Sequence, residues 1–290
     1  MPTHTPFERY ISGGVRFAGV GFYDEAGLFC GGVTALAAGE SAGLLRWYGL
    51  KQVGLTIPTR ERQTQTGDDE SLGSLTFQPT DPVGITVQAG LNDLNMAAAL
   101  QGVTSHDDGW MTMQPIYPSV EEIPPACFVI NSTAKKRVFG QNSLKGWEVW
   151  VLSSCEFSVG GPDGINERAL RSYDFGGVAD QVYMLPWGQP LMDDFNAFGG
   201  AGILTTLPQW FWLHAYRGHA STLTVELDYV PISAAKIQIR SYTIATGVWD
   251  DLAVTTDWTL SGKEITFTAS QAGKHNVIRY LHSGVVTAPA

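Results

Sequence analysis

Charged side chains are scarce in this chain of 290 residues, because they make up 16% of it, against roughly 25% in an average soluble domain. Basic side chains are the scarcer kind, since 18 Lys and Arg stand beside 28 Asp and Glu and give a formal net charge of −10. Proteins that hold duplex DNA use stripes of Lys and Arg to neutralise its phosphates. The composition therefore argues against a protein that grips DNA.

Cysteines and membrane-spanning segments are also lacking. The three cysteines, Cys30, Cys127 and Cys155, form no CxxC pair. We therefore expect that the protein has no disulfide framework and that it is synthesised in a reducing cytoplasm. Residues 1–10 lack the basic region and apolar run of a signal peptide. The uncharged stretch 195–216 is interrupted by polar residues and a proline, which predicts no membrane insertion.

Apolar residues are plentiful at 44%, with 11% aromatic residues and 33 glycines, which excludes a disordered chain and favours a mainly β fold. Alternating apolar and polar residues predict strands at 15–22, 50–57, 84–88, 147–159, 222–229, 236–244, 258–260, 265–269 and 277–281. One short helix is expected at 93–101, capped by Asn92 or Asp93 and ended by Gly102. A further helical turn is expected at 42–47.

Long polar or glycine-rich stretches predict four long loops, at 60–74, 106–125, 158–164 and 188–202. The excess negative charge lies wholly before residue 229, and Pro231 follows soon after that change. These two signals predict a boundary between a domain at 1–228 and a small β-sandwich module at 229–290, with a tight hairpin turn at Gly262.

No residue pattern points convincingly to catalysis. Residues 39–43 fit G-x-S-x-G around Ser41, but the strand–turn–helix setting of a hydrolase elbow is missing, so a turn is the better interpretation. His214 and His219 are spaced wrongly for a shared metal, and the acidic doublets lack the pattern of a calcium loop. Trp210 and Trp212 could share one strand face as a sugar platform, although burial is the favoured interpretation. We expect no catalytic, cofactor or metal site.

The order of segments resembles that of the major tail (tail tube) protein of long-tailed bacteriophages. A glycine-rich opening strand ends at residues 21–27, and the strand at 51–57 precedes the polar segment 59–70. Residues 75–81, a further strand and the short helix at 93–101 follow. Proteins of that family have such a strand–long loop–strand–helix arrangement, and some carry an immunoglobulin-like domain at the C-terminus.

The resemblance extends over residues 1–228 and implies a tail-tube β-sandwich or barrel with one short helix and long loops. Residues 229–290 would then be a small immunoglobulin-like β module. The implied protein is a structural virion component and not an enzyme. It would assemble into stacked rings, commonly homohexameric, that enclose a conduit for genome ejection.

The resemblance also implies roles for charged residues. Acids lining the bore would carry the same sign of charge as DNA, so the genome would slide without adhering, and the candidates are Glu148, Glu226 and Asp228. A polar loop would contact the next ring, and its candidate residues are Arg60, Arg62, Asp68, Asp69 and Glu70.

The implied partners are other copies of the chain, a tape-measure protein, and tail-terminator or baseplate proteins. Double-stranded DNA would pass through without specific binding. No cofactor is implied. The protein would be made in the host cytoplasm and would reside in the virion, as part of the phage tail.

Three alternatives stay open at the level of sequence. One is another virion component, such as a tail-completion, decoration, or receptor- or carbohydrate-binding protein. A second is a cellular binding module that uses its tryptophans. The third is a serine hydrolase acting through Ser41, which a fluorophosphonate probe would label.

Overall fold

The computed structural model describes residues 11–58, 61–67, 70–77, 81–89, 96, 99–100, 126–138, 141–162, 173–185 and 210–282. These residues form a mainly β protein in which every strand pairing in a sheet is antiparallel. The prediction of a mainly β fold is confirmed. Within the described ranges, no helix is both long and apolar enough to cross a membrane.

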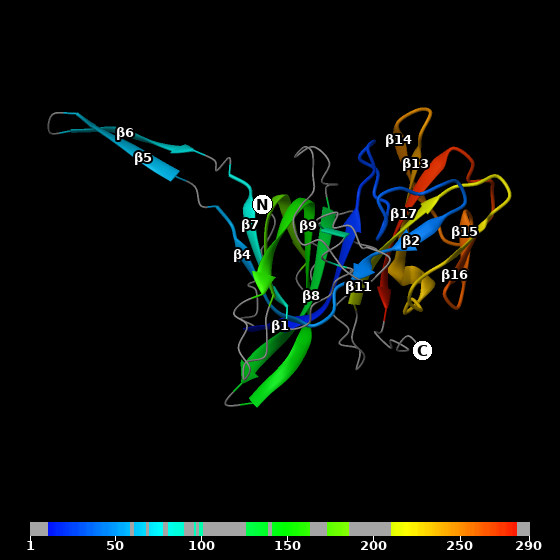
Figure 1. Ribbon diagram of the computed structural model, residues 1–290, viewed down its shortest axis with the longest axis horizontal. Coiled ribbons are helices and arrows are strands. Elements are labelled where there is room, and N and C mark those ends of the chain that lie inside the picture. Colours follow the sequence, from blue (N-terminus) through cyan, green and yellow to red (C-terminus); the bar gives the residue numbers. More distant parts are fainter. Residues whose placement is uncertain are drawn as a thin grey trace.

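The largest sheet has seven strands in the order β3-β1-β8-β9-β10-β7-β4. Its members are β1 (Ile11–Phe22), β3 (Leu45–Arg46), β4 (Leu50–Thr56), β7 (Val83–Ala89), β8 (Ala126–Val138), β9 (Gln141–Pro162) and β10 (Tyr173–Leu185). The sheet is rolled, so β1 and β4 approach each other although they lie near opposite edges. Figure 1 shows these strands in the middle of the molecule.

A two-layered β-sandwich lies beside the large sheet (Figure 1). Its five-stranded layer has the order β14-β13-β17-β11-β2 and its three-stranded layer the order β12-β16-β15. The strands are β2 (Ser41–Gly43), β11 (Trp210–Arg217), β12 (Thr224–Glu226), β13 (Ile237–Thr243), β14 (Val248–Leu252), β15 (Trp258–Ser261), β16 (Glu264–Phe267) and β17 (Lys274–His282). A short 3-10 helix, η3 (Ala234–Lys236), precedes β13.

The strand pairing crosses the boundary that we predicted between residues 228 and 229. β11 pairs with β17, and β12 pairs with β16, so residues from 210 onward already belong to the sandwich. β2 pairs with β11 as well, which brings a segment from the first fifth of the chain into the same sheet. The charge change in the sequence therefore does not coincide with the change of sheet.

Two hydrophobic cores organise the layers. One lies on the concave side of the rolled sheet and collects inward side chains from β1, β7, β8, β9 and β10, together with Trp47. The helical residues Met96 and Leu100 are buried in this core. The other core is continuous from the sandwich interior to the outer face of the large sheet, where Phe17, Val129 and Val149 contribute. The sandwich is thus packed onto the large sheet.

Asn131 connects the two units by hydrogen bonds at the contact between β8 and β11. Its side-chain amide nitrogen donates to the Phe211 carbonyl at 3.1 Å, and its Oδ1 accepts from the Phe211 N–H at 2.9 Å. Asn131 is fully buried. A single side chain therefore pairs with the β11 backbone as a neighbouring strand would, just beyond the end of β2.

Several sequence expectations were wrong. The predicted helical turn at 42–47 is instead β2 and β3, because both segments pair with strands of the two large sheets. The predicted loop at 60–74 is instead a hairpin of β5 (Glu61–Gly67) and β6 (Glu70–Phe77). Residues 158–162, predicted as loop, continue β9. Of the predicted helix, Met96, Ala99 and Leu100 are helical, and residues 93–95, 97–98 and 101 lie outside the described residues.

The loops predicted at 106–125 and 188–202 also lie outside the described residues. The other predicted strands are present, most of them with slightly different ends. At 222–229 the alternation is confirmed, since Val225 and Leu227 are buried while Thr224, Glu226 and Asp228 are exposed. The formal strand there is β12 alone. The turn at Gly262 is confirmed, with a φ of 62°.

We predict that Asn131→Leu lowers the free energy of unfolding by about 2–4 kcal/mol, because it removes the two buried hydrogen bonds between this side chain and the Phe211 backbone. Chemical denaturation measures the change. Gln52→Leu, at an exposed position of β4, is the matched control and should change stability by less than about 0.5 kcal/mol. Equal effects of the two substitutions would contradict the role of Asn131.

Candidate assembly surfaces

The three predicted lumen acids lie on two different sheets. Glu148 is in β9 of the large sheet, opposite Ser132. Glu226 is in β12 of the sandwich, where its carboxylate forms an exposed ion pair with Lys263. Asp228 follows that strand. The structure therefore does not bring Glu148 together with the other two acids on one face.

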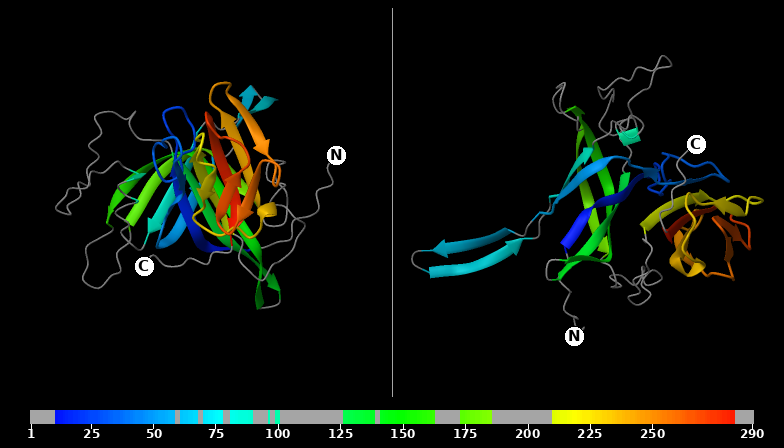
Figure 2. Two further views of the ribbon diagram at one scale, coloured as in Figure 1. Left: turned by 90° about the vertical axis from the view of Figure 1, so that its right-hand side faces the viewer. Right: turned by 90° about the horizontal axis from the view of Figure 1, so that it is seen from below.

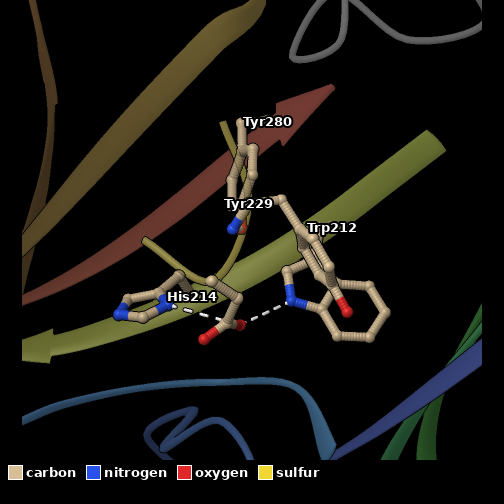
Figure 3. Close-up of polar contacts among 5 residues, drawn as sticks. Trp212, His214, Tyr229 and Tyr280 are labelled. Carbon is tan, nitrogen blue, oxygen red and sulfur yellow. Dashed lines mark hydrogen bonds and ion pairs between the residues drawn. The ribbon is translucent and has the colours of Figure 1, made fainter. Parts of the chain in front are cut away.

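Asp228 is held by contacts that fix the fold locally (Figure 3). Its Oδ2 accepts a hydrogen bond of 2.7 Å from Trp212 Nε1 and lies 3.7 Å from His214 Nδ1. Trp212 and His214 are both buried on the same face of β11. The carboxylate also lies against the backbone of Gly43 in β2. Asp228 thus connects the loop after β12 to β11 and β2.

Aromatic rings and a buried histidine surround this carboxylate. His282 stacks on Tyr229 with ring centroids 4.2 Å apart, and its ring is 5.1 Å from that of Phe17. Burial, with help from the nearby Arg46 cation, lowers the pKa of His282 to about 3. Burial also raises the pKa of Tyr280 well above its usual value. The site is built for neutral side chains packed around one carboxylate.

A different part of the large sheet presents an acidic face. Glu156 in β9 and Asp174 and Asp180 in β10 are exposed, while their neighbours Cys155 and Ala179 are buried. The alternation puts the acids on the outer face. Val178 lies directly opposite Glu156, and Asp174 lies opposite Gln88 of β7, whose Nε2 donates to it at 3.2 Å.

Small and neutral polar residues complete this outer face, and we call it the acidic face. Its described members are Gln52, Gly54, Thr56, Gly84, Thr86, Gln88, Glu156, Asp174, Gly176, Val178 and Asp180. Basic residues are nearly absent from the strands that form this face, namely β4, β7, β10 and the part of β9 that begins at residue 149. The one basic residue in them is Lys51, at the bulge in β4. The sandwich covers the other part of this outer face, which is formed by β1, β8 and the residues of β9 near Val149.

The large sheet has two edges with unpaired backbone. β3 pairs with β1 only at Gly19 and Val20, so the β1 backbone from Ile11 to Ala18 has no strand on that side within the described residues. β4 pairs with β7 on one side and has no described strand on the other. Unpaired edges are templates for adding another strand.

The β5–β6 hairpin carries the predicted stacking residues. Arg62 lies in β5 and Glu70 begins β6, while Arg60, Asp68 and Asp69 lie outside the described residues. The hairpin extends away from the large sheet in two perpendicular views (Figures 1 and 2). Its register runs from Glu61 opposite Phe77 to Gly67 opposite Glu70. The sequence predicted a loop at these residues, whereas the described ones form a two-stranded arm.

The other sequence candidates lie in structural positions. Ser41 is in β2, paired with Tyr216, and so is in a strand and not at a nucleophile elbow. Phe211 and Trp212 are buried and Trp210 is partly buried, which confirms the burial interpretation and removes the sugar platform. The three cysteines are buried free thiols. Among the described residues, no group of three or more His, Cys, Asp or Glu could hold a metal ion.

Comparison with known proteins adds no relative. No family model matches the chain, and no curated protein or solved structure matches it either. The functional argument therefore depends on the surfaces described above.

We predict that Gly43→Ala destabilises the protein by about 1–3 kcal/mol, because the added methyl group would overlap the Asp228 carboxylate. Asp228→Ala removes that overlap, so the double variant should lose less stability than the sum of the two single variants. Thermal and chemical denaturation of all four proteins measure this. Simple additivity would contradict the contact.

We predict that stability decreases as the pH falls below about 6.5, the ordinary pKa of histidine. The folded protein keeps His282 neutral down to about pH 3, whereas the unfolded chain takes up the proton, so acid favours unfolding. The loss is at most about 1.4 kcal/mol per pH unit from this group. His282→Phe keeps the stacked ring without titration, so its unfolding free energy should depend less on pH between 7 and 5.

Proposed function

We propose that this chain is the subunit of a phage tail tube, which assembles into stacked rings, commonly hexameric, around a conduit for genome ejection. The observation that carries the proposal is the acidic face. It is an exposed outer face of small polar and acidic residues on a rolled sheet, whose concave side is filled by a core and whose remaining outer face is covered by the sandwich. A surface that faces water and DNA without binding DNA needs this composition.

The open edges supply the ring contact in this proposal. The β4 edge of one subunit would pair with the β1 edge of the next, which extends the sheet and its acidic face around the ring. Such a head-to-tail contact joins two unlike surfaces, and it closes into a ring when the rotation between subunits permits. The sandwich, packed on the β1 side of the sheet, would lie outside the bore.

The acids that we propose for the bore differ from the candidates chosen from the sequence alone. Glu156, Asp174 and Asp180 lie on one face, and Glu148 of the same sheet stays a candidate. Glu226 is paired with Lys263, and Asp228 accepts from Trp212, so both have local partners in the sandwich. Because the field of an exposed charge decays within about 8 Å at physiological salt, acids act on DNA only when they line the bore directly.

The β5–β6 hairpin supplies the stacking contact in this proposal. A two-stranded arm has few contacts with its own subunit and is stabilised by a neighbour. The expected partners are other copies of the chain, a tape-measure protein and the proteins that end the tube, with the assembled protein in the virion. Double-stranded DNA would be a transient passenger, with no cofactor and no enzymatic step.

Electron microscopy of the purified chain over a range of concentrations tests the proposal. We expect hollow tubes of stacked rings with a bore wide enough for duplex DNA. The variant Glu156→Lys/Asp174→Lys/Asp180→Lys should still form rings, but it should retain duplex DNA in a salt-dependent manner, which co-sedimentation measures. Glu226→Lys is the control and should not retain DNA. Closed assemblies without a bore, or equal DNA retention by control and triple variant, would contradict the proposal.

A further inference from the structure

Arg46 is a cation without an anionic partner. Its guanidinium carbon lies 4.3 Å from the ring centroid of Phe17 and 4.8 Å from that of Tyr48. Within the part of the chain that the structure describes, no carboxylate forms an ion pair with it. Its Nη1 is buried and has no hydrogen-bond acceptor there. Arg46 as a whole is partly buried, and the Tyr229 hydroxyl is its hydrogen-bonding neighbour, so the buried Nη1 still lacks the carboxylate that normally pairs with a buried guanidinium.

A small pocket adjoins Arg46 at the gap between the two edges of the rolled sheet. Its volume is about 130 Å³, and it is lined by residues of β1 and of the β3–β4 connection, namely Val15, Phe17, Ala18, Arg46, Trp47, Tyr48, Gly49 and Leu50. Trp47 is 3% exposed, and its Nε1 is a second buried donor without an acceptor. Tyr48 at the rim is 45% exposed. The pocket therefore suits one short carboxylate side chain, which would satisfy a cation between two aromatic rings.

The hairpin offers such carboxylates. Asp68, Asp69 and Glu70 form the one run of three consecutive acids in the sequence, and Glu70 begins β6 where it pairs with the end of β5. Figures 1 and 2 show that the hairpin extends away from the sheet that contains the pocket. Glu70, which pairs with the end of β5 at the far end of the hairpin, is therefore held away from the pocket of its own subunit, which makes a second copy of the chain the candidate occupant.

We propose that the Arg46 pocket receives the acidic end of the β5–β6 hairpin of a second copy of this chain. The inference rests on the proposed function, because it names the surface on which the stacking arm docks. An arm seated at the gap between β1 and β4 of its neighbour would touch both edges that form the ring contact. Stacking and ring closure would then support each other.

Charge exchange tests the contact in the full-length chain. Arg46→Glu and Asp69→Lys/Glu70→Lys should each weaken self-association in sedimentation velocity by roughly ten- to a hundredfold. An equimolar mixture of the two variants should form a complex, since the acidic pocket of one meets the basic arm of the other. Lys263→Glu and Asp250→Lys/Glu264→Lys, all in the sandwich, carry the same charge changes at exposed positions and serve as matched controls.

Circular dichroism melting separates assembly from folding. Arg46→Glu removes contacts with two rings and could lower the Tm, whereas the arm variant lies away from both cores and should keep the wild-type Tm. If Arg46→Glu does not fold, Arg46→Gln and the arm variant carry the test, and both should weaken self-association. The inference is overturned if the arm variant associates as tightly as the wild type, or if its matched control loses as much affinity.

Electron microscopy of the same samples distinguishes this inference from the proposed function. Rings that form without stacking in the charge variants support both. Stacked tubes in all variants overturn the docking inference and leave the tube proposal standing. Association that depends on the charge pair but yields no rings overturns the tube proposal alone, and a wild-type chain that stays monomeric at every concentration overturns both.

Discussion

The two hydrogen bonds between Asn131 and the backbone of Phe211 hold the structure together as one unit. β11 is paired on one side along its whole length, but β2 covers the other side only at its later residues. The Asn131 amide supplies the donor and acceptor that the first part of β11 would otherwise lack. Since the contact is fully buried, it excludes any sliding of the sandwich across the sheet. The continuous core around Phe17, Val129 and Phe211 packs on this fixed alignment.

The fixed alignment decides which part of the large sheet stays open. The sandwich covers the outer face at β1 and β8, and the acidic face at β7 and β10 is left to solvent. The concave side is filled by its own core, so among the described residues the acidic face is the part of the large sheet that stays open to solvent. Two further features, the unpaired edges and the hairpin, lie on the borders of that face.

Local patterns in the sequence were sufficient for most strands and insufficient for the sheets. The alternation at Val225 and Leu227 identified buried positions because it depends only on neighbouring residues. The acids of the acidic face were not singled out from the sequence, since Glu226 and Asp228 show the same alternation as Asp174 and Asp180. Which acids share an open face depends on the pairing of β10 with β7 and β9, and no local pattern reports this pairing. The Asn131 contact, which joins residues 80 positions apart, gave no sequence signal either.

The hairpin and β2 illustrate the other kind of error. Residues 61–77 are polar and rich in turn-formers, so they resemble a loop, yet a two-stranded arm that extends away from the large sheet needs no apolar alternation. The segment around Ser41 is short and contains glycine, and it becomes a strand only because β11 offers a free edge. In both cases the pairing partner, and not the segment itself, determines the conformation.

The position of β17 has a consequence for synthesis. It is the last strand described, yet it lies in the middle of its sheet, between β13 and β11. Both neighbours leave the ribosome before it and must wait with one edge unpaired, although β11 can already pair with β2 and β13 with β14. The sandwich cannot close until residues 274–282 have been made, so its folding is governed by contacts distant in sequence and is slow. A nascent chain therefore cannot present its complete folded surface until translation has passed that strand.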